Sequence, residues 1–341
     1  MTDETSLNLF QQQEANRRRT FWLLSGFVLF LGWLGFGGDF IYALSTAHAP
    51  PPQQHHVWWF GFVMLGVGAA LAGYAYRTGA DKVLWATGAV EVVDPVDDKQ
   101  KQLVNVVEEM AIAAGVPRPR IWIVPDPDPN AFATGTDPMH AHVAVTQGLL
   151  EICNRDELQA VIAHELGHVK NLDVRLMTTL AALVGAVVLM RDGTSRLFLF
   201  GGDGSGGSGS RKKSDLGPLV VVLIVVWLLS WILAPIITQV LAMAVSRKRE
   251  YLADAMSAQF TRNPLALASA LQKIEAADLP TTHIKGGTAH MCIADPLGRR
   301  LTTREGLLPD VLATHPPMAK RVAILRGMGY AQLKQAGGAT A

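Results

Sequence analysis

The sequence predicts an α+β fold, mainly helical, in which one domain is integrated with membrane-spanning helices. Of its 341 residues, 49% are hydrophobic and only 17% are charged, whereas an average soluble domain has about 25% charged residues. The apolar residues are concentrated in long uncharged runs, and the segments between these runs carry ordinary helix and strand patterns. In addition, one predicted helix contains two histidines four residues apart, a spacing that suits a metal ion.

The composition excludes several classes of protein. The 30 Lys and Arg residues balance the 29 Asp and Glu residues, so the formal net charge is +1. A protein that binds nucleic acid by bulk charge has a strong basic excess, so we expect no nucleic-acid partner. The apolar content excludes intrinsic disorder. The two cysteines, Cys153 and Cys292, are too few for a disulfide framework.

A transmembrane hairpin is predicted over residues 20–76. Between Thr20 and Tyr76, Asp39 is the only Asp, Glu, Lys or Arg residue. The runs 21–44 and 57–76 each reach the roughly 20 residues that cross a hydrocarbon core. The first run is too long for a signal peptide and a second span follows it directly, which predicts an uncleaved anchor. Asp39 is either an ion or substrate site or a solvated residue near the outer interface, and its late position favours the solvated one.

Basic residues predict how this hairpin is oriented. Arg17, Arg18 and Arg19 precede the first span, no Lys or Arg lies in the loop, and Arg77 and Lys82 follow the second span. Because cytoplasmic flanks carry the excess of Lys and Arg, both ends of the hairpin should face the cytoplasm. Residues 1–19 are then a cytoplasmic N-terminal tail.

Residues 77–175 read as the first part of a water-exposed α/β domain. Apolar spacing predicts a helix over Lys99–Ala114, and short apolar segments predict strands over Ile121–Val124 and His142–Thr146. Asn154 and Glu157 fit a capping box that opens a further amphipathic helix.

That capped helix contains the pentapeptide His164-Glu165-Leu166-Gly167-His168. Residues four apart share a helical face, so both imidazoles can bind one metal ion, and imidazole suits zinc. Glu165 projects about 100° around the helix, where it can act as general base toward a water molecule. The structural alternative is a helix with two hydrogen-bonded surface histidines.

A third ligand is expected from the helix that contains Glu250 and Asp254. These residues share a face, so one can bind the metal while the other holds a ligand histidine. The alternative is a charged helix end next to a membrane span. Asp173 reads as helix-end structure, and neither His283 nor His290 is given a metal role.

Four segments, PNAFATG, HELGHVKNLD, SRKREYLAD and THPPMAKRVAIL, resemble the HtpX-type membrane zinc metallopeptidases, which are relatives of the CAAX-prenyl endopeptidases. The resemblance implies a zincin-type metalloprotease domain with a small edge-stranded sheet and one zinc ion per chain. It implies His164, His168 and Glu250 as zinc ligands, and Glu165 as the catalytic base.

The resemblance also assigns supporting roles. It implies that Asp254 holds a ligand histidine and that Asn130, in the edge strand along the cleft, helps to hold the substrate or the oxyanion. His315 and Arg321 would assist transition-state binding. These roles are chemically reasonable, because a free strand edge pairs with an extended peptide and a cation stabilises a developing oxyanion.

Residues 176–246 form an insert between the two parts of the protease domain, the second of which is 247–341. We expect a hydrophobic hairpin with a Gly/Ser-rich linker at 201–210. Because His168 and Glu250 must meet at one metal, the insert crosses the membrane an even number of times or not at all. Its first run, 176–190, gives about 22 Å of helix, short of a full span, so a re-entrant hairpin is nearly as well supported as full crossing.

The expected function is that of a multi-pass zinc endopeptidase of the bacterial inner membrane, with its active site facing the cytoplasm. Its expected substrates are membrane proteins or their juxtamembrane segments, and the resemblance implies a role in quality control of misfolded or damaged membrane proteins under stress. One alternative is a CAAX-type processing protease with the same chemistry. The other is a non-catalytic membrane scaffold, which the intact Glu165 disfavours. The sequence does not predict an oligomeric state.

Overall fold

A computed structural model of the chain describes residues 9–47, 50, 58–184, 221, 225, 227–229, 247–277, 279, 281–284, 288, 291–294 and 316–338. Most of the predicted insert, including its linker 201–210, lies outside these residues, as do His290 and His315. The chain divides into two compact units. We call residues 1–20, 76–182 and 240–341 the sheet unit, and residues 21–75 and 183–239 the hairpin unit.

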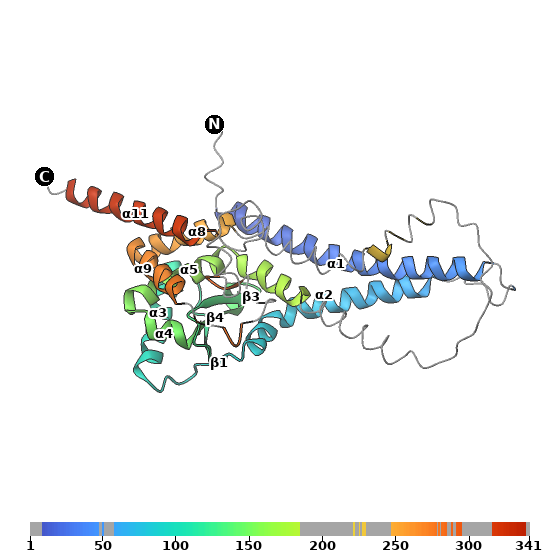
Figure 1. Cartoon of the computed structure of the whole chain (residues 1–341), viewed down its shortest axis with the longest axis horizontal. Coiled ribbons are helices and arrows are strands. Elements are labelled where there is room, and N and C mark those ends of the chain that lie inside the picture. The colour runs from blue at the N-terminus through green and yellow to red at the C-terminus, as the bar shows by residue number, and fades with distance from the viewer. Residues whose placement is uncertain are drawn as a thin grey trace. The chain divides into compact units, whose positions relative to one another are not determined.

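Two long helices carry the predicted membrane spans: α1 (Leu9–Thr46) and α2 (Trp59–Ala86) (Figure 1). Within them, Gln11–Leu44 and Trp59–Ala86 are long and apolar enough to cross a membrane. Both helices extend beyond the predicted spans, because no proline separates the apolar runs from their charged flanks.

The structure corrects the expectation for Asp39. Its side chain is buried, with 3% of the residue exposed, and its Oδ2 accepts a hydrogen bond of 2.7 Å from the backbone N–H of Gly61. Gly61 lies in the first turn of α2, where N–H groups lack an intrahelical partner and the helix dipole favours a negative charge. The predicted solvated position is therefore wrong, because the Asp39 carboxylate caps α2.

The sheet unit contains a four-stranded sheet in the order β1-β2-β4-β3. The strands are β1 (Val90–Glu91), β2 (Arg120–Val124), β3 (Ala131–Gly135) and β4 (Ala141–Thr146). β2 and β4 are parallel, whereas β1 pairs antiparallel with β2 and β3 pairs antiparallel with β4. β3 is thus an edge strand of the sheet, although all of its residues are buried.

Helices surround α5, the helix that carries the two histidines (Figure 1). Among the residues that the structure describes, the helices of this unit include α3 (Asp98–Ala114), α4 (Gln147–Ile152), α5 (Arg155–Lys170), α8 (Arg247–Thr261), α9 (Pro264–Ala276) and α11 (Met318–Gly338), and residues 173–182 are also helical. α5 contacts α3, α8, α9 and β3, and its apolar residues Ile162 and Leu166 are fully buried in the main core. The histidine-bearing helix is therefore the centre of the sheet unit.

The start of α5 is fixed as the sequence predicts. Asn154 Oδ1 accepts from the backbone N–H of Glu157, and Glu157 Oε2 accepts from the N–H of Asn154. The Glu157 carboxylate also accepts hydrogen bonds from Ser269 Oγ and Lys273 Nζ of α9. The predicted capping box is confirmed, and it also links α5 to α9.

Candidate metal centre

Three side chains from two helices converge at one point. His164 and His168 project from α5, and Glu250 projects from the first turn of α8. Glu250 Oε2 lies 3.6 Å from His164 Nε2, and Glu250 Oε1 lies 3.5 Å from His168 Nε2. Zinc bound tetrahedrally at about 2.0–2.1 Å holds its ligand atoms about 3.3 Å apart. One ligand atom from each group lies within 4.8 Å of the other two, close enough for all three groups to bind one metal ion.

The two helices pack against each other at Gly167. A Cβ atom added there would be in ordinary van der Waals contact, 3.4 Å from Ala253 Cα and 3.4 Å from Met256 Cβ. Nearby, Ser257 Oγ of α8 donates a hydrogen bond of 2.7 Å to the Ala160 carbonyl of α5. These contacts bring the start of α8 opposite the histidines, which explains how Glu250 reaches them across a long sequence separation.

A carboxylate lies beside the Nδ1 atom of each histidine. His164 Nδ1 is 3.0 Å from Asp254 Oδ1, and His168 Nδ1 is 3.2 Å from Asp173 Oδ2. A proton on Nδ1 that points to a carboxylate leaves Nε2 as the lone-pair donor for a metal. Helical spacing alone left the roles of Glu250 and Asp254 open, and the family resemblance implied Glu250 as the ligand and Asp254 as the support of a ligand histidine. The geometry places Glu250 at the Nε2 atoms and Asp254 behind His164.

The electrostatics of this cluster favour a cation. Burial tends to lower the pKa of His168, but hydrogen bonds to Asp173 and Glu250 outweigh it and raise that pKa to about 10. The pKa of His164 is also raised, against the effect of burial, by Asp254 and Glu250. Carboxylates thus surround both rings, and a bound divalent ion would take the place of the protons.

Buried polar atoms without a hydrogen-bond partner support the same conclusion. Among the described residues they include Glu165 Oε1 and both ring nitrogens of His164, although Nδ1 lies 3.0 Å from Asp254 Oδ1. An unsatisfied buried polar atom costs about 1–3 kcal/mol, so native proteins rarely leave one without an ion or a water molecule. The donor set of two imidazoles and one carboxylate is a known zinc set. The residues present therefore fit a zinc ion.

Arg321 contacts the carboxylates of Asp254 and Glu250. Its Nε and Nη2 atoms donate to Asp254 at 2.9 and 2.7 Å, and its Nη1 donates to the Ile293 carbonyl at 2.9 Å. The same Nη1 lies 3.3 Å from Glu250 Oε2. Although burial acts in the opposite direction, Arg321 and His164 lower the pKa of Asp254 to about 2. Asp254 is therefore a fixed anion between a ligand histidine and a buried arginine.

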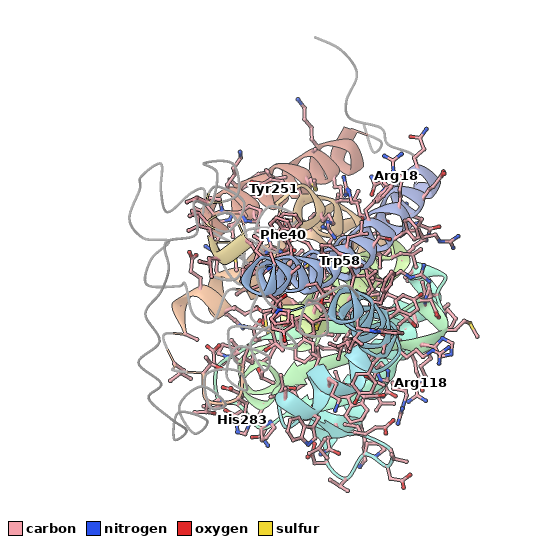
Figure 2. The ribbon with its side chains drawn as sticks, turned by 90° about the vertical axis from the view of Figure 1, so that its right-hand side faces the viewer. Arg18, Phe40, Trp58, Arg118, Tyr251 and His283 are labelled. Atoms are coloured by element: carbon pink, nitrogen blue, oxygen red, sulfur yellow. The ribbon has the colours of Figure 1, made fainter. Side chains whose placement is uncertain are left out.

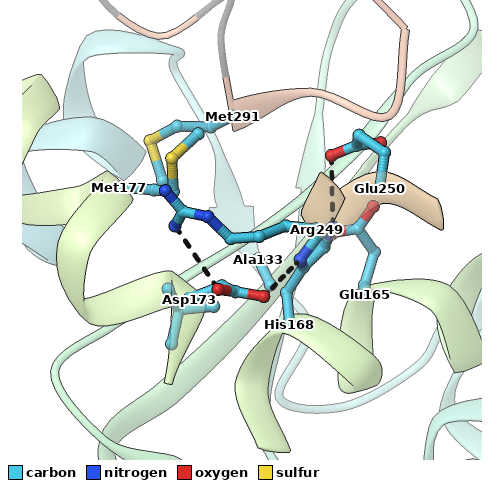
Figure 3. A pocket seen from close by; sticks show the side chains of 9 residues that line it. Ala133, Glu165, His168, Asp173, Met177, Arg249, Glu250 and Met291 are labelled. Atoms are coloured by element: carbon cyan, nitrogen blue, oxygen red, sulfur yellow. Dashed lines mark hydrogen bonds and ion pairs between the residues drawn. The ribbon is translucent and has the colours of Figure 1, made fainter. Parts of the chain in front are cut away.

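A small cavity opens beside the cluster (Figure 3). Its lining consists of Ala133, Glu165, His168, Asp173, Val174, Met177, Arg249, Glu250 and Met291. The cavity volume is about 20 Å³, enough for one water molecule. Burial raises the pKa of Glu165, and a general base works best when its pKa approaches the working pH.

The edge strand β3 runs along this cavity, and its outward-facing backbone is partly occupied. The Ala131 carbonyl accepts from the Ile293 N–H at 2.9 Å, and the Gly135 N–H donates to Thr178 Oγ1 at 3.1 Å. Between them, Ala133 lines the cavity and its N–H bonds the Glu165 carboxylate. Across the same edge, Phe132 forms an antiparallel β-bridge with Cys292, so Ala133 is the β3 residue that lines the cavity.

The other predicted site residues that the structure describes do not line the cavity. Asn130 is buried, with its amide donating to the Ala294 carbonyl and accepting from the Ala131 N–H. Neither Asn130 nor Arg321 lines the cavity, so their roles toward the substrate or the transition state stay predictions. His315 lies outside the described residues. His283, labelled in Figure 2, donates its backbone N–H to Asp126 Oδ2 at 2.7 Å.

Sequence reasoning missed the role of Asp173 beside His168. The available signal was its place five residues after the histidine, but spacing alone does not show that the chain turns back. Leu172 adopts a left-handed conformation with φ of 60°, which is uncommon for a residue other than glycine. This turn ends α5 and brings the Asp173 carboxylate back to the ring.

Comparisons with known proteins identify the family of the chain. Residues 97–329 match peptidase family M48. Among curated proteins, the chain is 38% identical over 330 residues to a "Protease HtpX homolog" of Caldanaerobacter subterraneus subsp. tengcongensis, covering 95% of this chain and 99% of that one. It is 42% identical over 256 residues to a homolog of the same name from Dictyoglomus turgidum, covering 75% and 78%. Among solved structures, it is similar to S. mikatae Ste24p, with 18% identity, a TM-score of 0.45, and coverage of 94% of this chain and 67% of that one.

Proposed function

Because this chain belongs to peptidase family M48 and is a metalloprotease, we propose that it is a membrane-integrated endopeptidase that binds one zinc ion per chain. The observation that carries the zinc proposal is the convergence of His164, His168 and Glu250 beside Glu165. These three ligands leave a fourth position for water, as catalytic zinc sites do.

In this proposal, each residue of the centre has a separate task. When bound, the zinc ion supplies Lewis acidity and lowers the pKa of a water molecule. Glu165 would act as the general base, accepting a proton from water on its carboxylate and delivering it to the leaving amine. Asp254 and Asp173 keep the rings of His164 and His168 oriented through their Nδ1 atoms.

We propose that the substrate binds as an extended strand along β3. Ala133 lies on this edge beside Glu165, and a substrate strand that pairs with its N–H would replace the bond to the Glu165 carboxylate. Backbone pairing gives affinity with little demand on sequence, which suits a protease that acts on many damaged proteins. Met177 and Met291 line the same cavity, and their flexible side chains suit varied apolar residues of the substrate.

The proposed location is the bacterial inner membrane, with the active site facing the cytoplasm. Two helices are long and apolar enough to span, and the matched relatives come from bacteria. Arg17, Arg18 and Arg19 before the first span support the cytoplasmic orientation. Membrane proteins and their juxtamembrane segments are then the proposed substrates, and quality control of misfolded or damaged ones is the proposed role.

The test is a comparison of the full chain with its Glu165→Gln variant, both purified in detergent and loaded with zinc. Incubated with a destabilised membrane protein, the wild type should cleave it and Glu165→Gln should lose at least about 100-fold in rate, because it lacks the base. Both proteins should contain equal zinc. Cleavage by Glu165→Gln at the wild-type rate would contradict the proposed mechanism.

A further inference from the structure

The first turns of α1 contact the end of the histidine-bearing helix α5. Gln13 Nε2 donates to the Lys170 carbonyl at 2.7 Å, and Asn16 Nδ2 donates to the Asn171 carbonyl at 3.0 Å. The last carbonyl groups of a helix have no intrahelical partner. Two amides of α1 therefore complete the hydrogen bonding at the end of α5.

Asn16 makes one contact that Gln13 does not. Its Nδ2 also donates to Asp173 Oδ1 at 2.8 Å, and 3% of Asn16 is exposed. The other oxygen of that carboxylate, Oδ2, bonds His168 Nδ1 at 3.2 Å. A chain of two hydrogen bonds thus connects Asn16 with the ring of a metal ligand.

The Asp173 carboxylate depends on outside donors for its orientation. It follows Leu172, whose left-handed backbone turns the chain back toward α5. Arg249 Nη1 approaches Oδ1 at 3.3 Å, which is longer than the bond from Asn16, and Figure 3 shows Asp173 between His168 and Arg249. The hydrogen bond from Asn16 is therefore the shorter of the two described hydrogen bonds to Asp173 Oδ1.

From this geometry we propose that Asn16 is a positioning residue of the metal centre, acting on His168 through Asp173. The inference rests on the proposed zinc site. The helix that begins in the N-terminal tail then has a second task besides anchoring, because it completes the support of a zinc ligand. Groups that orient a metal ligand from outside typically change metal affinity about 10–100-fold when they are lost.

The test measures zinc affinity by chelator competition on the full chain in detergent, without any peptidase assay. Asn16→Leu removes both hydrogen bonds of the amide and should weaken zinc binding about 3–10-fold, because it acts one step further out than Asp173. Asn16→Asp faces Asp173 with a second carboxylate and should weaken it about 10–100-fold. Gln13→Leu is the matched control, since it loses an amide bond to the same helix end and does not touch Asp173, and it should keep the wild-type affinity.

Two further measurements separate positioning from general stability. The zinc-free forms of Asn16→Leu and Gln13→Leu should unfold at similar temperatures, and the Co²⁺ absorption spectrum should change only in Asn16→Leu. Adding Asp173→Asn to Asn16→Asp restores a donor–acceptor pair and should recover part of the affinity.

Equal zinc affinities for Asn16→Leu and the wild type would overturn this inference alone, as would an equal loss in Gln13→Leu. A wild-type chain that binds no zinc would instead overturn the proposed function, and this inference with it.

Discussion

Replacing Asp254 should destabilise the protein strongly even without metal. Arg321 is fully buried and its guanidinium makes two hydrogen bonds to Asp254. Removing one partner of a buried ion pair costs about 3–5 kcal/mol, because the other charge stays buried without compensation. Glu250 Oε2 lies 3.3 Å from Nη1 and compensates in part, so we expect about 3 kcal/mol for Asp254→Ala.

The assay is thermal unfolding of the full chain in detergent after a chelator has removed any bound metal. A loss of 3 kcal/mol should lower Tm by about 6–12 °C, at about 2–4 °C per kcal/mol for a domain of this size. The double variant Asp254→Ala with Arg321→Met should be more stable than Asp254→Ala alone, because no buried charge remains unpaired. The control is Glu109→Ala, which breaks the exposed pair with Arg155 and should cost at most about 1 kcal/mol.

Two results would refute this reasoning. The first is a loss in Asp254→Ala no larger than that of the exposed control. The second is a double variant whose destabilisation equals the sum of the two single ones, because the two side chains would then act independently.

Three other properties follow from the charges in the sheet unit. Burial raises the pKa of the Cys153 thiol to about 12, so the native protein should resist iodoacetamide at pH 8 at this position, and rapid labelling would contradict its burial. In the metal-free protein the pKa of His168 is raised to about 10, so His168 must lose a proton to bind zinc. Zinc affinity should therefore rise with pH between about 6 and 9, and a zinc affinity that does not change with pH would contradict this prediction. Burial tends to raise the pKa of Glu157, but hydrogen bonds from Lys273, Ser269 and the Asn154 N–H outweigh it and lower that pKa. The ionised Glu157 side chain therefore stabilises the folded protein at pH values above the ordinary glutamate pKa of about 4.3, and this stabilisation is lost as pH falls through the lower pKa of the folded state. Glu157→Gln should therefore cost about 1–3 kcal/mol at pH 7 and progressively less in acid, as measured by denaturant unfolding at several pH values.

The sequence predicted the features that depend on local spacing. The capping box of Asn154 and Glu157 and the shared face of His164 and His168 each involve residues within one helical turn. Long uncharged runs likewise predicted α1 and α2. Periodicity and capping express such contacts directly, so these elements are recognisable without knowledge of the tertiary structure.

The contacts that support the centre were not predictable in this way. Glu250 and Asp254 share a face, so only the packing of α8 on α5 distinguishes the ligand position from the one behind His164. Asp173 reaches its histidine through a left-handed turn at Leu172, and a leucine in the sequence does not predict such a turn. Asn16 meets Asp173 across 157 positions of sequence.

Asp39 shows the same limit in the hairpin unit. A carboxylate in an apolar run requires a partner or water, and the sequence offers no charged partner nearby. Its partner is a backbone N–H at the start of α2, and a backbone group carries no sequence signal. The solvated position was therefore inferred wrongly.

The central claim is that His164, His168 and Glu250 hold one zinc ion. Its most direct test is the zinc content of the purified full chain, measured by mass spectrometry for the wild type and for Glu250→Ala after equal dialysis against a weak chelator. We expect one zinc per chain in the wild type and a loss of most of it in Glu250→Ala. Equal zinc content in the two proteins would contradict the ligand assignment.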